Sequence, residues 1–126
     1  MESGREFHWA IRPKENPNEL IGMISLMRKV DDNRGFWLDP AWQGRGLMSE
    51  ACNAVTGFWF DTLGQEVLRV PKASGNAASR AISEKGGMRV IWYGERDFVS
   101  GRLAAELWEI TADEWRQQQL PVPEAD

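Results

Sequence analysis

The 126-residue sequence contains a single cysteine, Cys52, and a single histidine, His8. One cysteine cannot form an internal disulfide, and this pair cannot supply the clustered ligands of a zinc site, so we expect no bound metal. The two residues fall in different expected elements, which also argues against a cysteine–histidine nucleophilic pair. Cys52 stands next to Ala51 and near Val55, a setting that favours a small buried side chain. We expect His8 to be a structural residue of a strand.

The sequence also lacks a long apolar run and an excess of basic residues. No stretch approaches the about 20 apolar residues that a membrane-spanning helix needs, and no targeting segment is recognisable. The chain carries 19 acidic and 15 basic residues, a net charge of −4, whereas nucleic-acid backbones require a basic face. These features predict a cytoplasmic protein without membrane or nucleic-acid partners. Seven tryptophans indicate a core or ligand groove rich in large flat side chains.

Hydrophobic periodicity predicts one domain of the α/β (α+β) class over residues 1–126. The expected elements, in order, are strands over 7–13, 20–27 and 34–38, a helix over 44–63, a strand over 66–70 closed by Pro71, a helix over 76–85, strands over 88–93 and 103–110 joined by a charged turn at 94–101, and a short helix over 112–119. Residues 1–5 are expected to form a loose lead, and a Pro-containing tail ends the chain. The order β-β-β-α-β-α-β-β predicts a mixed central sheet with helices on its faces. The right-handed crossover within 34–70 predicts that its two strands are parallel neighbours or nearly so.

The stretch 36–51 is the most informative part of the sequence. An apolar strand, Phe36-Trp37-Leu38, leads through Asp-Pro into the loop Gln43-Gly44-Arg45-Gly46, and a helix starts at once. Glycines let the backbone approach a ligand closely, and the unpaired N–H groups of a helix start favour an anion. Such a place binds phosphate, although many α/β proteins have one.

A second motif follows one strand later and makes the pattern more specific. The first motif consists of Leu38-Asp39-Pro40, the run from Gln43 to Met48, and Glu50-Ala51. The second consists of Asn76-Ala77-Ala78-Ser79 followed by Glu84-Lys85-Gly86-Gly87-Met88. Together the two motifs resemble the GNAT acetyltransferases. The branch that the chain resembles most acetylates the N-termini of ribosomal proteins (RimJ/RimL-like). The resemblance covers roughly residues 6–112.

The resemblance implies an acetyl-CoA site. The pyrophosphate would be held by the backbone N–H groups of Gln43, Gly44, Arg45, Gly46, Leu47 and Met48. Met48 departs from the small residue that is usual at its position. The strand Phe36-Trp37-Leu38 would pair with the pantetheine arm as if the cofactor were an added strand, and would hold the oxyanion. This arrangement requires the strands 34–38 and 66–70 to splay apart.

Asn76 and Ser79 would complete this site, with Asn76 near the thioester and Ser79 near the sulfur, where a hydroxyl could protonate the departing thiolate. Structural roles stay open for several residues. Arg45 could be a solvated surface side chain, Trp37 and Trp42 could pack in the core, Asn76 could be only a helix cap, and Ser79 only a helix-surface serine.

The implied reaction is direct transfer of acetyl from CoA to a neutral amine, whose proton a carboxylate should accept. Glu95 and Asp97, in the charged turn, are the candidate bases, and solvated turn charges are the alternative reading. Tyr93 is a weaker alternative acid. The acceptor would be a protein N-terminus, a peptide or a small amine.

The chain also departs from the family pattern. Relatives begin with a strand and two helices, whereas this sequence starts at about the second family strand. A sheet without its first strand exposes an edge, so we expect a homodimer. Two functions therefore stay open, an active N-acetyltransferase and a non-catalytic acyl-CoA-binding or interaction module. A dinucleotide-binding domain is disfavoured because its acidic ribose partner is missing.

Overall fold

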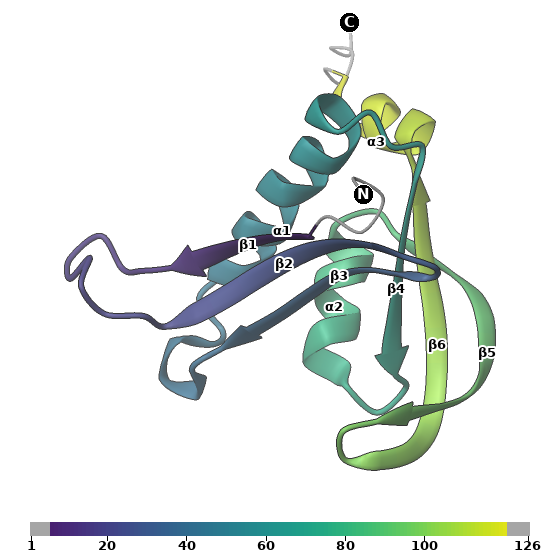
Figure 1. The fold of residues 1–126 in the computed structure, drawn as a ribbon, viewed down its shortest axis with the longest axis horizontal. Helices are drawn as coiled ribbons and strands as arrows, with labels where there is room; N and C mark the ends of the chain where they lie inside the picture. Colours follow the sequence, from purple (N-terminus) through teal and green to yellow (C-terminus); the bar gives the residue numbers. More distant parts are fainter. Residues whose placement is uncertain (1–5, 121–126) are drawn as a thin grey trace, which may run out of the picture.

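The computed structural model describes residues 6–120, so the expected lead at 1–5 and the tail at 121–126 lie outside the described residues. The strands are β1 (Glu6–Ile11), β2 (Gly22–Lys29), β3 (Asp32–Leu38), β4 (Val67–Ala73), β5 (Arg89–Phe98) and β6 (Gly101–Thr111). The helices are α1 (Leu47–Gly57), α2 (Ala77–Lys85) and α3 (Ala112–Gln119), with a 3-10 turn at Pro40–Trp42 and a π-helical turn at Phe58–Thr62. The α/β class and the expected element order are confirmed (Figure 1). Within 6–120, no helix combines the length and hydrophobicity needed to cross a bilayer.

The sheet differs from the expected single mixed sheet in one respect, because it is divided into two antiparallel halves. One half has the strand order β1-β2-β3 and the other β4-β6-β5. The strands β3 and β4 run parallel where they approach, since Asn33 lies beside Arg69 and Phe36 beside Lys72. From there they diverge (Figure 1). The splaying that an acetyl-CoA site requires is therefore present.

Two residues of β4 explain why no ladder joins it to β3. The backbone N–H of Arg69 points toward β3 but donates to the Asn33 side-chain Oδ1, at 2.9 Å. Backbone N–H groups two residues apart face the same strand edge, so the nitrogen of Pro71 also faces β3, and proline has no hydrogen to donate. The expectation that Pro71 ends the strand is wrong, because β4 is the edge of its sheet and proline is tolerated on a side that needs no donor.

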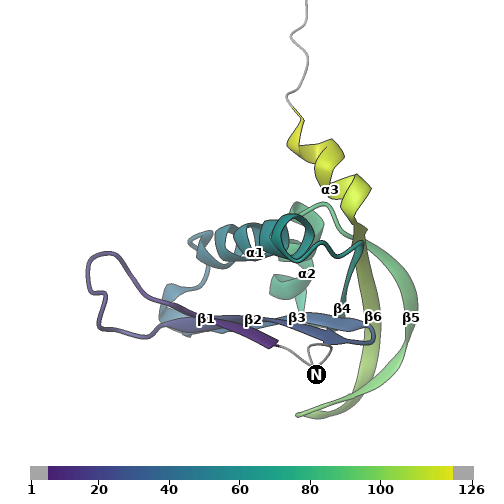
Figure 2. The same ribbon diagram turned by 45° about the horizontal axis from the view of Figure 1, so that its top comes forward.

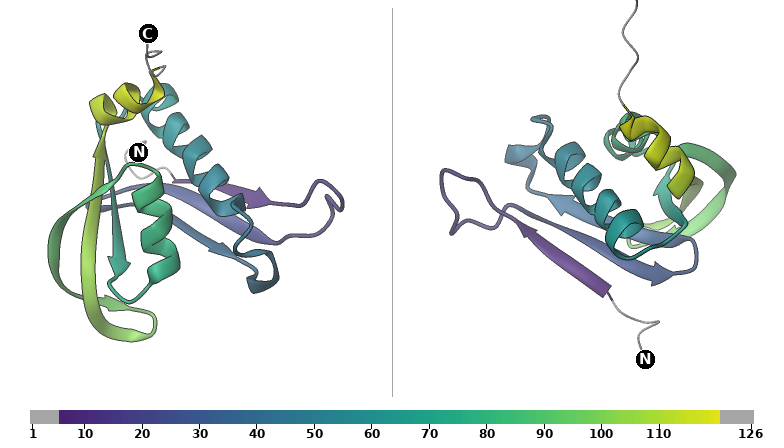
Figure 3. Two further views of the ribbon diagram at one scale, coloured as in Figure 1. Left: turned by 180° about the vertical axis from the view of Figure 1, so that it is seen from behind. Right: turned by 90° about the horizontal axis from the view of Figure 1, so that it is seen from above.

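The core lies between the sheets and the helices α1 and α2, which cover the same face of the β1-β2-β3 sheet (Figure 2). From behind, the two helices lie side by side (Figure 3). The apolar face expected for the first helix is confirmed, with Met48, Val55 and Trp59 buried, and Cys52 is buried in the same cluster. His8 lies on β1, where its ring bonds the Ser25 hydroxyl of β2 at 2.6 Å.

The region 94–101 is not the charged turn expected from the sequence. The strand β5 continues to Phe98 and β6 starts at Gly101, so the two form one long hairpin arm. Arg102 of β6 binds both Glu95 and Asp97 of β5, at 3.3 and 3.0 Å. Opposite charges facing each other across two strands stabilise the pairing, so a charged stretch can be strand as well as turn.

Gly22 marks a close backbone approach, one of the two readings that a glycine inside an apolar strand allows. A Cβ atom there would lie 2.6 Å from the backbone oxygen of Trp37 on β3. The alternative, a bulge, occurs elsewhere in this strand pair, between Leu26 and Lys29.

Replacement of Gly22 by alanine should therefore destabilise the fold. We expect Gly22→Ala to lower the free energy of unfolding by about 1–3 kcal/mol, because β3 must move away from the new methyl group. Gly35→Ala is the matched control, since its Cβ would meet only the end of the Met27 side chain at 3.7 Å. Urea denaturation of the two variants measures the difference, and equal stabilities would contradict the close approach.

Candidate functional site

The loop between β3 and α1 is held open by local hydrogen bonds. Asp39 Oδ1 accepts the N–H of Ala41 at 2.9 Å, and the Gln43 side-chain amide donates to the Leu38 carbonyl at 2.9 Å. Gly44 and Gly46 have φ of 80° and 78°, a left-handed conformation that side chains disfavour. Gly46 caps α1 without a side-chain hydrogen bond, so the first N–H groups of the helix stay available to an anion.

A cavity of about 400 Å³ joins this loop to β3 and to the start of α2. Its lining consists of Phe36, Leu38, Gln43, Gly44, Gly46, Leu47, Met48, Ser49, Asn76, Ala78, Ser79 and Ile82. All the residues predicted to bind the cofactor line it except Trp37 and Arg45. The structure thus brings together two motifs that are about 30 residues apart in the sequence, because the helix α1 and the strand β4 between them return the chain to the same end of the fold.

Trp37 and Arg45 lie outside the cavity for separate reasons. Side chains alternate along a strand, so Trp37 points away from the face that carries Phe36 and is exposed. The Arg45 guanidinium lies 4.7 Å from the Trp42 ring centroid and donates to the Ala41 carbonyl at 3.3 Å. Arg45 and Trp42 thus stack on each other at the outer side of the loop.

The free edge of β3 borders the same opening. The N–H of Asp39 donates to Ile21 on the β2 side, so by alternation the backbone groups of Phe36 and Leu38 face β4. No ladder pairs them there, because β3 bonds to β2 and β4 to β6, and the Leu38 carbonyl accepts the Gln43 side-chain amide. An extended ligand could therefore add to this edge as a strand would.

At the start of α2, Asn76 acts as the helix cap, since its Oδ1 accepts the N–H of Ser79 at 3.2 Å. The Ser79 hydroxyl in turn accepts a hydrogen bond from Lys72 Nζ at 2.5 Å. Asn76 and Ser79 also line the cavity, so capping does not exclude ligand contact.

Lys72 is a site residue that the sequence analysis missed. Only 4% of it is exposed, and burial, followed by the nearby cation of Arg34, lowers the pKa of Lys72 to about 8. A signal was available, because Leu68, Val70 and Lys72 alternate along β4 and all point inward. Because the expected strand ended at Pro71, Lys72 was not counted among its inward-facing residues.

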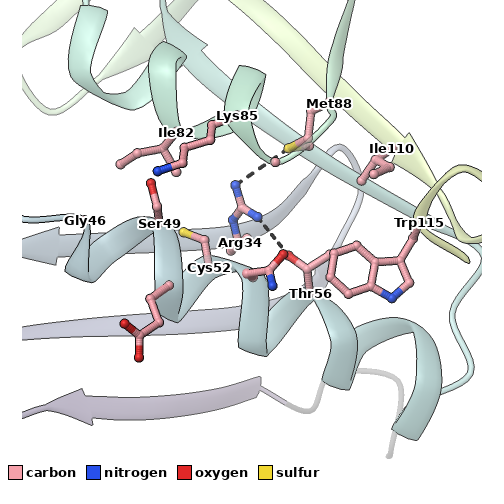
Figure 4. A pocket seen from close by; sticks show the side chains of 13 residues that line it. Arg34, Gly46, Ser49, Cys52, Thr56, Ile82, Lys85, Met88, Ile110 and Trp115 are labelled. Carbon is pink, nitrogen blue, oxygen red and sulfur yellow. Dashed lines mark hydrogen bonds between the residues drawn. The ribbon is translucent and has the colours of Figure 1, made fainter. Parts of the chain in front are cut away.

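Arg34 on β3 is the second missed residue, with 5% of its surface exposed. It donates to Thr56 Oγ1 at 2.9 Å and to Met88 Sδ at 3.6 Å, and within residues 6–120 its Nε has no partner. The guanidinium lies between α1 and α2, where it lines a second cavity of about 290 Å³ (Figure 4). Burial lowers the pKa of Arg34 and raises the pKa of the neighbouring Cys52 thiol, which therefore stays protonated at neutral pH.

The predicted bases lie elsewhere. Glu95 and Asp97 stand on the β5–β6 arm with side chains 69% and 82% exposed, both bound to Arg102, and neither lines the cavity. Tyr93 is an exposed residue of the same strand. The buried carboxylate nearest to Lys72 in the strand register is Glu106, which accepts from Arg80 Nε at 2.8 Å and from Trp108 Nε1 at 3.0 Å.

Comparisons with known proteins agree with this geometry. The family described as "Acetyltransferase (GNAT) domain" matches residues 1–89. YdaF of Bacillus subtilis, named for an inferred ribosomal N-acetyltransferase activity, is 33% identical over 72 residues, which is 54% of this chain and 39% of that protein. The chain thus spans well under two thirds of the length of that relative.

Solved structures show the same fold. The spermidine N-acetyltransferase SpeG of Vibrio cholerae, as its F149A mutant, matches with a TM-score of 0.76 and 15% identity over 91% of this chain and 70% of that one. An inferred ribosomal-protein-serine acetyltransferase of Vibrio cholerae matches with a TM-score of 0.70 and 18% identity, over 84% of this chain and 64% of that one. The resemblance stated from the two motifs is confirmed.

The cap and ligand roles of Asn76 can be separated by substitution. We expect Asn76→Ala to lower the free energy of unfolding by about 1 kcal/mol through loss of the cap, and Asn76→Ser to retain most of the stability. Asn53→Ala, at an exposed position on α1, is the control and should change stability by only a few tenths. Urea unfolding measures this, and an Asn76→Ala variant as stable as the control would contradict the capping role.

Proposed function

Because the chain belongs to the GNAT acetyltransferase family, we propose that it binds acetyl-CoA at the loop 43–48 and transfers the acetyl group directly to a primary amine. The observation that carries the proposal is the single cavity that connects the glycine loop with Asn76 and Ser79. A phosphate-binding loop alone would suit many ligands, whereas a serine hydroxyl that lines the same cavity suits a ligand with a reactive end.

The loop has the form that a pyrophosphate needs. No atom lies within 4 Å of a Cβ built on Gly44 or Gly46, so these positions border open space in which phosphate oxygens could approach the backbone. The N–H groups at the start of α1 would donate to those oxygens. Arg45, stacked on Trp42 at the outer side, adds a positive charge to the approach.

The free edge of β3 would hold the pantetheine arm, and Phe36 and Leu38 would line its path. The thioester would then lie beside Asn76 and Ser79, which line the same cavity. The acceptor amine attacks the acetyl carbon, the N–C bond forms, the C–S bond breaks, and the electron pair stays on sulfur. Ser79 then gives its hydroxyl proton to the thiolate.

The acceptor amine must also lose a proton, and no carboxylate lines the cavity within the described residues. A general-base role for Glu95 or Asp97 stays a prediction. Both carboxylates are held by Arg102 on the β5–β6 arm, and neither lines the cavity. The presence of Ser79 with a buried lysine at its oxygen favours transfer over a non-catalytic acyl-CoA-binding module.

Assembly and location remain proposals. The outer edge of β1 has no partner strand among the described residues, and an edge of this kind can pair with a second chain, which supports a homodimer. A cytoplasmic location and the lack of nucleic-acid and membrane partners remain predictions from composition.

The loop proposal predicts the effect of one methyl group. Gly46→Ala should raise the Kd for acetyl-CoA about tenfold or more, which corresponds to the loss of about one charge-assisted hydrogen bond. Gly64→Ala is the matched control, because Gly64 has a similar φ of 68°, an equally open Cβ position and no place at the cavity. Isothermal titration calorimetry compares the two, and an equal Kd in both variants would refute the site.

Transfer itself is tested by release of CoA thiol with spermidine and with a peptide that begins with serine, acceptors suggested by the substrates named for the related proteins. Thiol release together with acetylated product supports the proposed function. Tight acetyl-CoA binding without transfer to either acceptor would instead support the acyl-CoA-binding module.

A further inference from the structure

We propose that Lys72 supplies the proton that Ser79 delivers to the departing CoA sulfur. The inference rests on the proposed function and assigns a role to a residue that the glycine-loop and α2 motifs do not contain. Lys72 acts through Ser79, so it is a positioning and proton-supplying residue.

The hydrogen bond between the two side chains has a direction. Lys72 Nζ is a donor when protonated and lies 2.5 Å from Ser79 Oγ, so the serine oxygen accepts. The hydroxyl hydrogen of Ser79 is then available to donate to a group in the cavity. Ser79 lines the cavity whereas Lys72 does not and is almost fully buried, so a proton from Lys72 reaches the cavity through Ser79.

Charged and titratable groups reach Lys72 from several elements. Arg34 comes from β3 and Cys52 from α1, while Glu106 lies opposite on β6 and is held by Arg80 of α2. Within the described residues no carboxylate lies within ion-pair distance of Lys72, so burial and the Arg34 cation dominate. They lower its pKa to about 8, against the opposing influence of Cys52 and Glu106.

This value suits a proton donor at neutral pH. An ordinary lysine, with a pKa of about 10.4, holds its proton too firmly to give it up readily, and a donor is most effective when its pKa lies near the working pH. The arrangement also explains why two cations are buried side by side. Arg34 keeps the ammonium of Lys72 ready to lose a proton.

The step balances without any further reactant. As the C–S bond breaks, the sulfur keeps the electron pair and takes the hydroxyl proton of Ser79. Ser79 Oγ takes a proton from Lys72 Nζ, which is left as a neutral amine. Lys72 regains a proton from solvent before the next turnover.

The sign of the pH dependence follows. The reaction needs protonated Lys72, so kcat should fall as the pH rises through about 8. The acceptor amine acts in the opposite sense, because it must be neutral to attack, and the two together give a bell-shaped profile. Removal of the Arg34 cation raises the pKa of Lys72 and should move the alkaline limb to higher pH.

The test is a pH profile of kcat, measured with acetyl-CoA and whichever of spermidine or the serine peptide reacts faster. We expect Lys72→Met to lower kcat at pH 7 by about 10- to 100-fold and to remove the alkaline limb, while the Kd for acetyl-CoA changes by less than about threefold. Arg34→Met should keep an alkaline limb displaced upward. Lys14→Met, at an exposed position in the β1–β2 loop, is the matched control and should leave the profile unchanged.

A direct titration accompanies the kinetics. The ¹³Cε resonance of Lys72, assigned by its loss in Lys72→Met, should titrate near pH 8 in the wild-type protein and at higher pH in Arg34→Met. This measurement needs no acceptor. It therefore separates failure of the Lys72 assignment from failure of the proposed function.

Several outcomes would contradict the proposal that Lys72 supplies a proton through Ser79. An unchanged alkaline limb in Lys72→Met would do so, as would full recovery of kcat in Lys72→Arg, because arginine keeps the charge but does not release a proton. Gain of one acetyl group on Lys72 itself, seen by mass spectrometry, would show an acceptor in place of a proton donor. If Lys72 titrated in the wild-type protein at the pKa of an ordinary lysine, proton supply by Lys72 would also be refuted. If Lys72 titrated near pH 8 but the protein transferred acetyl to neither acceptor, only the proposed function would be refuted.

Discussion

The structure depends on a missing hydrogen-bond ladder between two parallel strands. The Arg69 N–H donates to the Asn33 side chain, and Pro71 has no N–H, so β4 offers no donor to the backbone of β3 at these two positions on that edge. The two half-sheets can then separate. The cavity at the glycine loop, the free edge of β3 and the buried side chains between the strands all follow from this separation.

The same separation accounts for the charges inside the protein. A closed sheet would pack apolar side chains at the inward positions of β3 and β4, and a lone cation there would be costly. Where the strands diverge, Arg34 finds the Thr56 hydroxyl and the Met88 sulfur, and Lys72 finds the Ser79 hydroxyl. Neutral acceptors replace carboxylates, so both groups stay buried without a tight ion pair that would hold the lysine proton.

Local chemistry made much of the fold readable from the sequence. The glycine loop and the Asn76 cap are specified by residues within a few positions of each other, and the periodicity of Met48, Val55 and Trp59 identifies the buried face of α1. Lys72 and Arg34 could not be found in this way. Their roles arise from neighbours on other elements, and the assumption that proline ends a strand removed Lys72 from the inward face of β4.

In the β5–β6 hairpin, the local sequence predicts the wrong structure. Glu95 and Asp97 were placed in a turn because charges and glycines are typical of turns. Pairing with Arg102 across β5 and β6 outweighs that preference, and no feature of 94–101 alone could reveal it. The long-range partner decides the local structure there.

The tight turn between β2 and β3 has a consequence for how such a site can change. Asp31 adopts a left-handed conformation with φ of 59° there, and the pairing register shifts just before it, between Leu26 and Lys29. A slip of one residue in this hairpin would exchange the two faces of β3, turning Phe36 outward and Trp37 inward. A change of length at this turn that shifted the register would therefore take Phe36 out of the cavity lining, although the turn lies at the opposite end of β3 from the glycine loop.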